Sequence, residues 1–282
     1  MKRFSVLDAL EKKGRGEKLT MLTAYDHPTA SMLDEAGVDI ILVGDSLGMT
    51  VLGYENTLAV TMTDMIHHGR AVARGVRRAL VVVDMPFMSY HGGCDRAVRN
   101  AGRLIQCTGA QAVKVEGGET VTGTVRAICD AGIPVMGHLG LTPQSVNALG
   151  GLRVQGRDRE SAARLLRDAV RLEQAGIFAL VLECVPHQLA LLVSSRVHVP
   201  TIGIGAGAGC DGQVLVTPDL LGLFRAFKPK FAKVYAQLYD EAKTAVETYL
   251  NEVRQGAFPG PEHSFGLPDH VWAELKGELT CE

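Results

Sequence analysis

Short apolar runs recur along the chain, and each is followed by a turn and a stretch with the spacing of an amphipathic helix. The runs are rich in Val, Ile and Leu and do not alternate strictly with polar residues, which is typical of parallel strands covered on both faces. They predict strands over 19–26, 39–45, 79–86, 112–118, 133–140, 178–186, 199–207 and, with the poorest pattern, 219–224. The helix-like stretches between them include 61–77, 94–109, 119–131, 158–175 and 187–195.

Several of these stretches end in an Ala-Gly or Gly-Ala pair, at 36–37, 109–110, 131–132 and 175–176. Glycine just past a helix supplies the left-handed conformation that closes it. Eight strands that each lead into a crossover predict an α/β fold, and they favour a (β/α)8 TIM barrel over an open doubly wound sheet.

A long helical segment is predicted over 231–255, and a tail rich in Pro and Gly follows it. No stretch between the predicted elements has the composition of a linker. We therefore expect a single barrel domain with a C-terminal helix over residues 1–265. For the tail, residues 266–282, the sequence predicts no role.

The composition excludes several classes of protein. The 282 residues are 46% hydrophobic and carry a net charge of −2, so nothing predicts binding to nucleic acid or to an anionic membrane. The six cysteines show no CxxC pairs and no spacing with His, which indicates reduced thiols and not a disulfide framework or a zinc site. No signal peptide is recognisable, and no apolar run approaches the roughly 20 residues of a membrane span. A cytoplasmic protein is expected.

Ionisable side chains stand at or near the carboxyl ends of five predicted strands. They are Asp45, Asp84, Lys114 with Glu116, His138 and Glu183. In a barrel these ends meet at one rim, where enzymes of this architecture carry their chemistry. Charges gathered there are costly unless they pair or bind a cation. The pattern therefore predicts that these residues form one site.

Each residue also has a simpler interpretation. Asp45 and Ser46 could cap a following helix, because both residue types lead the N-cap preferences. Asp84 could only end a strand. Lys114 and Glu116 lie two apart on one strand and could form a private salt bridge on one face.

His138, Glu183 and the glycine run over 203–207 also have simpler interpretations. His138 could be a hydrogen-bonded histidine of the core, and Glu183 could be solvated at the rim. The GIGAG sequence over 203–207 is similar to a phosphate-binding loop, but a short glycine run is a weak signal and can equally permit a close approach of a ligand or of backbone.

Taken together, the strand ends favour metal chemistry. Asp45, Asp84 and Glu116 offer carboxylate oxygens, which suit Mg²⁺ better than zinc. A metal there could chelate an α-keto acid and stabilise the enolate that forms when the adjacent carbon loses a proton. Lys114 would place a positive charge beside the substrate, and Glu183 would be the general base.

Six or more motifs in order resemble the ketopantoate hydroxymethyltransferase family. They include GDSLGMTVLGYENTLAVT, VKVEGG, GHLGLTPQSVNALGG, LVLECVP, IGIGAGAGCDGQVLV and KPKFAKVY, and the resemblance covers about residues 3–265. It implies a barrel of the phosphoenolpyruvate/pyruvate type. It also implies transfer of a one-carbon unit from 5,10-methylenetetrahydrofolate to 3-methyl-2-oxobutanoate, which gives 2-dehydropantoate and tetrahydrofolate in pantothenate biosynthesis. The family is typically homodecameric, so a homo-oligomer is expected.

The resemblance also implies roles for the strand-end residues. It assigns the Mg²⁺ contacts to Asp45, Asp84 and Glu116. It assigns the contacts with the keto acid to Asp45, Ser46, Asp84, Lys114 and His138. Glu183 is implied as the acceptor of the substrate proton. The resemblance names no residue of the folate pocket.

Two rival functions are left open by the residues. The first is a C–C or P–C lyase or mutase of the same barrel type, for which Cys94 is the nearest candidate for a reactive loop cysteine, although it lies in no such motif. The second is a catalytically silent barrel that binds a phosphorylated ligand through 203–207. The intact set of strand-end residues argues against the second.

Overall fold

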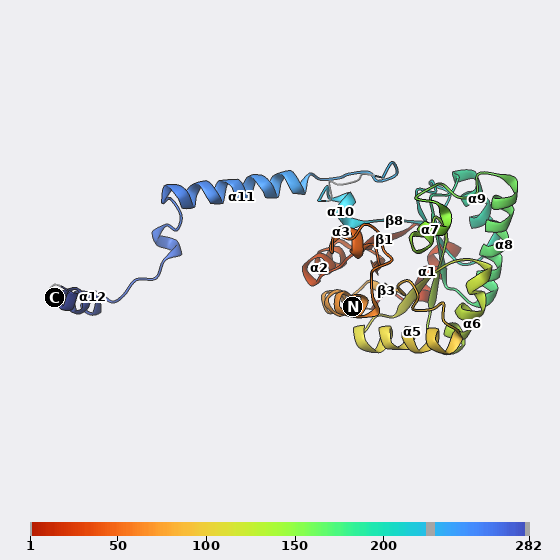
Figure 1. The fold of residues 1–282 in the computed structure, drawn as a ribbon, viewed down its shortest axis with the longest axis horizontal. Coiled ribbons are helices and arrows are strands. Elements are labelled where there is room, and N and C mark those ends of the chain that lie inside the picture. Colours follow the sequence, from red (N-terminus) through yellow and green to blue (C-terminus); the bar gives the residue numbers. More distant parts are fainter. Residues whose placement is uncertain (1, 224–228, 280–282) are drawn as a thin grey trace. The chain divides into compact units, whose positions relative to one another are not determined.

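Eight parallel strands close into a barrel in which each strand pairs with the next along the chain and the last pairs with the first (Figure 1). The computed structural model describes residues 2–223 and 229–279. The strands are β1 Leu19–Thr23, β2 Ile40–Val43, β3 Leu80–Asp84, β4 Ala112–Glu116, β5 Val135–Gly140, β6 Ala179–Glu183, β7 Thr201–Ile204 and β8 Gly212–Leu215. The predicted (β/α)8 barrel is therefore confirmed.

Helices follow every strand except β7, which a loop joins directly to β8. They are α1 Val6–Gly14, α2 His27–Ala36, α3 Leu47–Thr50, α4 Met62–Gly75, α5 Cys94–Thr108, α6 Thr122–Asp130, α7 Val146–Leu149, α8 Arg159–Ala175, α9 His187–Arg196 and α10 Thr217–Leu220, with short 3₁₀ turns η1 Glu119–Val121 and η2 Pro143–Ser145. Positive φ angles at Gly37, Gly109, Gly132 and Gly176 confirm the predicted glycine helix ends.

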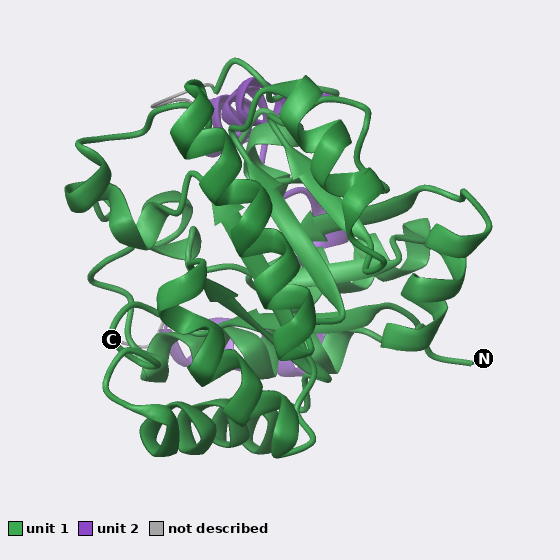
Figure 2. Ribbon diagram, turned by 90° about the vertical axis from the view of Figure 1, so that its right-hand side faces the viewer, with its two compact units in different colours: residues 1–235 green, residues 236–282 purple. Residues whose placement is uncertain are grey.

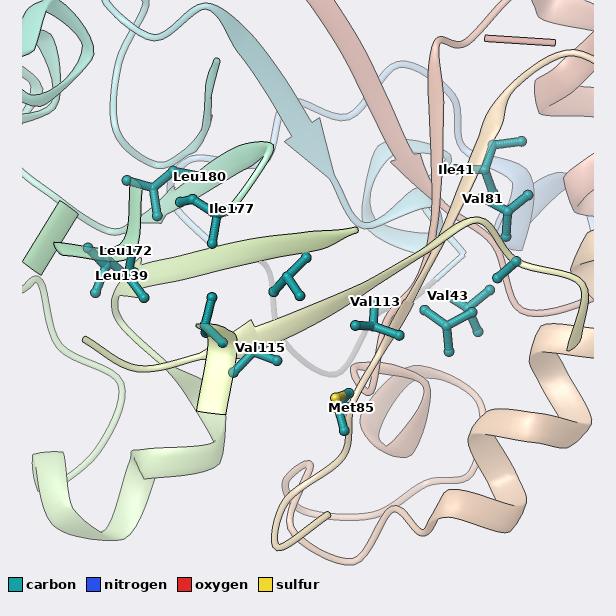
Figure 3. Packing of buried hydrophobic residues seen from close by; sticks show 14 of the residues in the cluster. Ile41, Val43, Val81, Met85, Val113, Val115, Leu139, Leu172, Ile177 and Leu180 are labelled. Atoms are coloured by element: carbon teal, nitrogen blue, oxygen red, sulfur yellow. The ribbon is translucent and has the colours of Figure 1, made fainter. Parts of the chain in front are cut away.

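Two apolar layers explain why the strands read as unbroken hydrophobic runs. Side chains such as Ile40 and Leu42 fill the inside of the barrel. Their neighbours Ile41 and Val43 point outward and pack beneath the helices. Figure 3 shows part of this outer layer, with side chains of neighbouring strands beside Leu172 of α8. Because both faces of each strand are buried, polar residues do not alternate with apolar ones along it.

The eighth strand was predicted in the wrong place. Residues 219–224 do not form a strand where they are described. The strand is Gly212–Leu215, and 217–220 form α10, with Pro218 in its first turn. A Cβ at Gly212 would come within 2.7 Å of the Leu19 carbonyl oxygen, so this position admits only glycine where β8 approaches β1. A glycine and an exposed Gln213 give β8 no apolar pattern to recognise.

The N-terminal helix α1 lies against the amino ends of the strands. Phe4 and Val6 pack against the cluster inside the barrel. Lys12 Nζ lies 2.9 Å from Asp39, just before β2. Lys13 Nζ lies 3.0 Å from Asp211, just before β8, and donates to the carbonyl oxygens of three residues, Ser194, Val197 and Val199. Helix α1 thus closes this end of the barrel.

Replacing Lys13 with methionine should lower the free energy of unfolding by about 2–4 kcal/mol, because a largely buried carboxylate and three carbonyl groups lose their donor at once. Urea titration followed by circular dichroism measures the change. Lys2→Met is the matched control, since its side chain is 82% exposed and its pairing with Asp8 is solvated. An equal, small effect of both variants would contradict the role given to Lys13.

The contacts divide the chain into residues 1–235 and 236–282 (Figure 2). The second unit contains α11 Leu238–Gln255, a 3₁₀ turn η3 Pro261–His263 and α12 Asp269–Leu279. The helix predicted from 231 begins only at Leu238. Residues 231–237 are irregular because Phe231 packs against the barrel cluster and Ala232 is buried. Assignment of residues 236–265 to the barrel domain stays a prediction.

Two further predictions concern the cysteines and membrane-spanning helices. The five described cysteines are free thiols, as expected, and the sixth, Cys281, lies outside the described residues. Within the described part of the chain, no helix is long and apolar enough to cross a membrane.

Candidate functional site

The strand-end residues meet inside the carboxyl end of the barrel, as predicted. Asp45, Asp84, Lys114, Glu116 and His138 are each at most 4% exposed. Lys114 Nζ lies 2.9 Å from Asp84 Oδ1 and 3.7 Å from Glu116 Oε1. The lysine therefore links two strands, and its pair with Glu116 is not the private salt bridge that the spacing alone allowed.

Asp45 does not use its side chain as a helix cap. Its carboxylate accepts a hydrogen bond from Gln144 Nε2 at 2.8 Å, and its backbone N–H donates to Asp84 Oδ2 at 3.0 Å. Ser46 is the residue that begins α3, and its hydroxyl makes no capping bond. That hydroxyl lies 2.8 Å from the Tyr25 hydroxyl. The loop after β2 thus presents both Asp45 and Ser46 to the site.

His138 connects two carboxylates. Its Nδ1 lies 3.1 Å from Glu116 Oε1, and its Nε2 lies 3.3 Å from Glu183 Oε2. Burial and the charge of Lys114 lower the pKa of His138, but the charge of Glu116 and the hydrogen bonds of the two glutamates outweigh them and raise this pKa to about 9. Lys114 Nζ also lies 3.3 Å from Nδ1. These contacts place the imidazole in the site and not in the core.

Glu183 is the most accessible member of the set, with a side chain that is 17% exposed. It ends β6, and the next residue, Cys184, has a φ of +47°. On the adjacent strand, a Cβ at Gly140 would come within 2.2 Å of the Glu183 carbonyl oxygen. A left-handed turn and a close backbone contact therefore fix the place of Glu183 at the rim.

The site is strongly anionic. Burial, followed by the charges of Asp84 and Glu116, raises the pKa of Asp45 well above its usual range. Burial also raises the pKa of Asp84, while His138 and Lys114 outweigh burial at Glu116 and lower its pKa. A cation near Asp45 and Asp84 would relieve this repulsion.

The donor set fits a hard divalent cation that takes few protein ligands. Asp84 Oδ1 accepts no hydrogen bond, although it lies within ion-pair distance of Lys114. Asp84 Oδ2 accepts the backbone N–H of Asp45. Glu116 also has partners at both oxygens, because Oε1 lies beside His138 and Oε2 accepts the backbone N–H of Gln144 at 3.0 Å. No group of three or more His, Cys, Asp and Glu side chains in the described ranges is arranged to hold a metal. The residues thus fit a cation that takes one or two carboxylate ligands and keeps several waters.

Gln144 and Tyr90 were missed by sequence reasoning. The Gln144 amide donates to Asp45 and to the Met85 carbonyl oxygen, and its Oε1 accepts the Tyr90 hydroxyl at 2.6 Å. Both side chains are buried. Gln144 lies within the GHLGLTPQSVNALGG motif, but it follows the strand by several residues, and no pattern showed that its loop folds back over the site.

Changing Gln144 to leucine should lower kcat/KM by about 10- to 100-fold, because groups that orient a ligating carboxylate have effects of this size. Steady-state kinetics with both substrates measures it. Gln155→Leu is the control, since its side-chain amide bonds only to the exposed Arg153 carbonyl among the described residues. Activity within twofold of the original in Gln144→Leu would rule out an orienting role.

A cavity of about 640 Å³ opens above the cluster. Gly205 of the 203–207 run lines it, and both Gly205 and Gly207 have positive φ angles. A Cβ at Gly205 would come within 2.8 Å of the Phe231 ring, and one at Gly207 within 2.6 Å of His187 Cβ. These glycines therefore permit close packing of side chains, whereas the sequence had suggested a phosphate loop or a close approach of a ligand or of backbone.

The sequence matches the family described as "Ketopantoate hydroxymethyltransferase" over residues 3–261. The chain belongs to the ketopantoate hydroxymethyltransferase family. A relative from Acetivibrio thermocellus, named 3-methyl-2-oxobutanoate hydroxymethyltransferase, is 57% identical over 97% of this chain and 96% of its own length. A relative of the same name from Moorella thermoacetica is 60% identical over 90% of this chain and 94% of its own length.

Solved structures with the same fold align with this ketopantoate hydroxymethyltransferase family member over nearly its whole length. Phosphonopyruvate hydrolase, in complex with oxalate and Mg²⁺, aligns with a TM-score of 0.61 and 14% identity over 100% of this chain and 97% of that chain. 2,3-Dimethylmalate lyase, described as a member of the PEP mutase/isocitrate lyase superfamily, aligns with a TM-score of 0.57 and 16% identity over 98% and 99%. At these identities the likeness concerns the fold.

Proposed function

We propose that this enzyme transfers a hydroxymethyl group from 5,10-methylenetetrahydrofolate to 3-methyl-2-oxobutanoate, giving 2-dehydropantoate and tetrahydrofolate. Family membership supports the reaction. The observation that carries the proposal is the buried cluster of Asp45, Asp84, Lys114 and Glu116, with Glu183 at its edge, on the floor of one cavity. Proton removal beside a carbonyl needs such an arrangement of charge and base.

Asp45 and Asp84 would hold a divalent cation, with Mg²⁺ as the ion that carboxylates and water oxygens suit best. When bound, the cation supplies positive charge to the carboxylate and keto oxygens of the substrate and so acidifies its C3–H bond. Glu116, whose oxygens lie beside His138 and the Gln144 backbone N–H, would contribute through its charge and through water. The structure of phosphonopyruvate hydrolase, a relative in fold, is described with Mg²⁺ and oxalate.

Lys114 and Ser46 would orient the keto acid. The charges of Asp84 and Glu116 outweigh burial and raise the pKa of Lys114, so the ammonium is charged at neutral pH. It can donate to a substrate oxygen and stabilise the charge that develops there. The Ser46 hydroxyl, held by Tyr25, lines the same cavity and can donate to the substrate carboxylate.

Glu183 would accept the C3 proton. The His138 ring beside it limits the rotation of the carboxylate, since the other ring nitrogen lies against Glu116. Water cleaves the two carbon–nitrogen bonds of the methylene group, which releases tetrahydrofolate and leaves the carbon at the oxidation level of formaldehyde. The carbanion equivalent at C3 then adds to this carbonyl carbon, so that one C–C bond forms and the resulting alkoxide takes up a proton to become the hydroxymethyl group.

The decisive test is tetrahydrofolate formation by the purified chain. We expect it to require both 3-methyl-2-oxobutanoate and Mg²⁺, and to stop with a chelator. Turnover of another α-keto acid, without this requirement for folate, would favour the lyase or mutase rival instead. Nothing in the structure favours that rival, because Cys94 is exposed at the start of α5 and does not line the cavity. Cytoplasmic location and homo-oligomeric assembly stay predictions.

A further inference from the structure

One carboxylate in the cavity has no part in the mechanism above. Asp219 lies in the short helix α10, after β8, and lines the cavity half-buried. Its side chain makes no hydrogen bond or ion pair with any described residue. Burial raises the pKa of Asp219 to about 6. A half-buried carboxylate that lines a cavity is expected to accept hydrogen bonds from a bound ligand.

The backbone that carries Asp219 is firmly anchored. Thr217, two residues earlier, is buried at 1% exposure. Its backbone N–H donates to the Thr23 hydroxyl at 3.0 Å, and its hydroxyl donates to the Thr23 carbonyl oxygen at 2.6 Å. Pro218 follows it. Asp219 is thus held by the barrel itself, on a rigid element that suits a binding residue.

Strand order places Asp219 apart from Asp84 and Glu116. These two residues end β3 and β4, whereas Asp219 follows β8, which lies across the closed barrel from β4. Asp45, after β2, is nearer, because only β1 separates β2 from β8. The cavity therefore has a second part, over β7 and β8, away from Asp84, Lys114 and Glu116.

The walls of this second part suit a flat, partly polar ring system. Phe231 closes over Gly205 and gives an aromatic surface, and Val214 and Val216 give apolar ones. Lys230 and Arg153 also line the cavity and are exposed. The volume of about 640 Å³ is in the range of pockets for ligands much larger than a five-carbon acid.

We propose that Asp219 binds the pterin ring of the folate co-substrate, accepting hydrogen bonds from its 2-amino group and its N3–H. These two donors lie side by side on one edge of the ring and match the two oxygens of a carboxylate. The inference rests on the proposed function and adds to it a subsite over β7 and β8. Asp219 acts here as a residue for binding and positioning, not as the base.

The test compares the original enzyme with Asp219→Asn, which keeps the shape and removes the charge. KM for 5,10-methylenetetrahydrofolate should rise at least tenfold, while KM for 3-methyl-2-oxobutanoate changes less than twofold. Asp95→Asn, at an exposed position in α5 that does not line the cavity, is the matched control and should change neither. Equal changes in the two KM values for Asp219→Asn would overturn the assignment.

A second measurement identifies the contact on the ligand. Binding of tetrahydrofolate and of its 2-desamino analogue is measured calorimetrically with both enzymes. Loss of the amino group should weaken binding to the original enzyme by tenfold or more, and weaken binding to Asp219→Asn by less than threefold, since the two changes remove one interaction. Additive losses would reject the pairing. If the original enzyme forms no tetrahydrofolate at all, the proposed function fails, whereas normal turnover with unchanged folate binding by Asp219→Asn rejects only the subsite.

Discussion

Glu183→Gln should slow exchange of the C3 proton of 3-methyl-2-oxobutanoate into deuterium oxide by about 10²- to 10⁴-fold, the usual contribution of a positioned general base. Glutamine has the same shape and still reaches His138, but it cannot accept the proton. Exchange needs only the keto acid and the metal, so proton NMR isolates this step from the chemistry of the folate.

Binding of the keto acid should change far less than exchange in this variant, because Glu183 lies at the edge of the cluster and not among its most buried charges. Calorimetric titration with the keto acid and Mg²⁺ measures the affinity. Glu119→Gln, at an exposed position in η1, is the matched control and should exchange normally. Undiminished exchange by Glu183→Gln would show that another group removes the proton.

Asp45→Asn should raise the stability of the metal-free protein and lower its activity. In the absence of metal, the buried Asp45 carboxylate faces the charges of Asp84 and Glu116, and its pKa is raised. A carboxyl whose pKa rises on folding stabilises the fold below the pKa of the unfolded chain, about 3.9, and loses that contribution as the pH rises. At pH 7 the neutral asparagine should therefore raise the unfolding temperature in a chelator, by about 2–4 °C for each kcal/mol relieved. This gain should vanish toward pH 4.

The same substitution should remove most of the turnover and most of the stabilisation by Mg²⁺, because a ligand oxygen and its charge are lost together. Thermal scans with chelator and with Mg²⁺, at pH 7 and near pH 4, measure the effects on stability, and tetrahydrofolate formation measures turnover. A lower unfolding temperature for Asp45→Asn in the chelator at pH 7 would mean that the carboxylate is stabilised by its neighbours, contrary to the charge balance described here.

Most strands of the barrel could be predicted from the sequence, because strands covered on both faces have long apolar runs. The prediction failed at β8, where a four-residue strand holds a glycine that must contact β1 and a solvent-exposed Gln213. It also began the long helix too early, since the apolar residues around Phe231 pack onto the barrel instead of forming a helical face. In both cases tertiary packing outweighed the local pattern.

The site was predictable where its residues end strands, because the architecture itself brings those positions together. Asp45, Lys114 and His138 were found in this way. Gln144 and Asp219 were not, because each lies on a segment after its strand, and the path of such a segment depends on contacts that no periodicity encodes. Tyr90, which supports Gln144 from the loop after β3, was missed for the same reason.

Because α1 closes the amino end of the barrel, it affects the order in which substrates bind and products leave. With Lys12 and Lys13 bound across that end, ligands can arrive and depart only past the opposite rim. In the proposed function the keto acid would bind on the cavity floor, and the bulkier co-substrate in the same cavity would obstruct its exit. We therefore expect an ordered kinetic mechanism in which the keto acid binds first and its hydroxymethylated product leaves last.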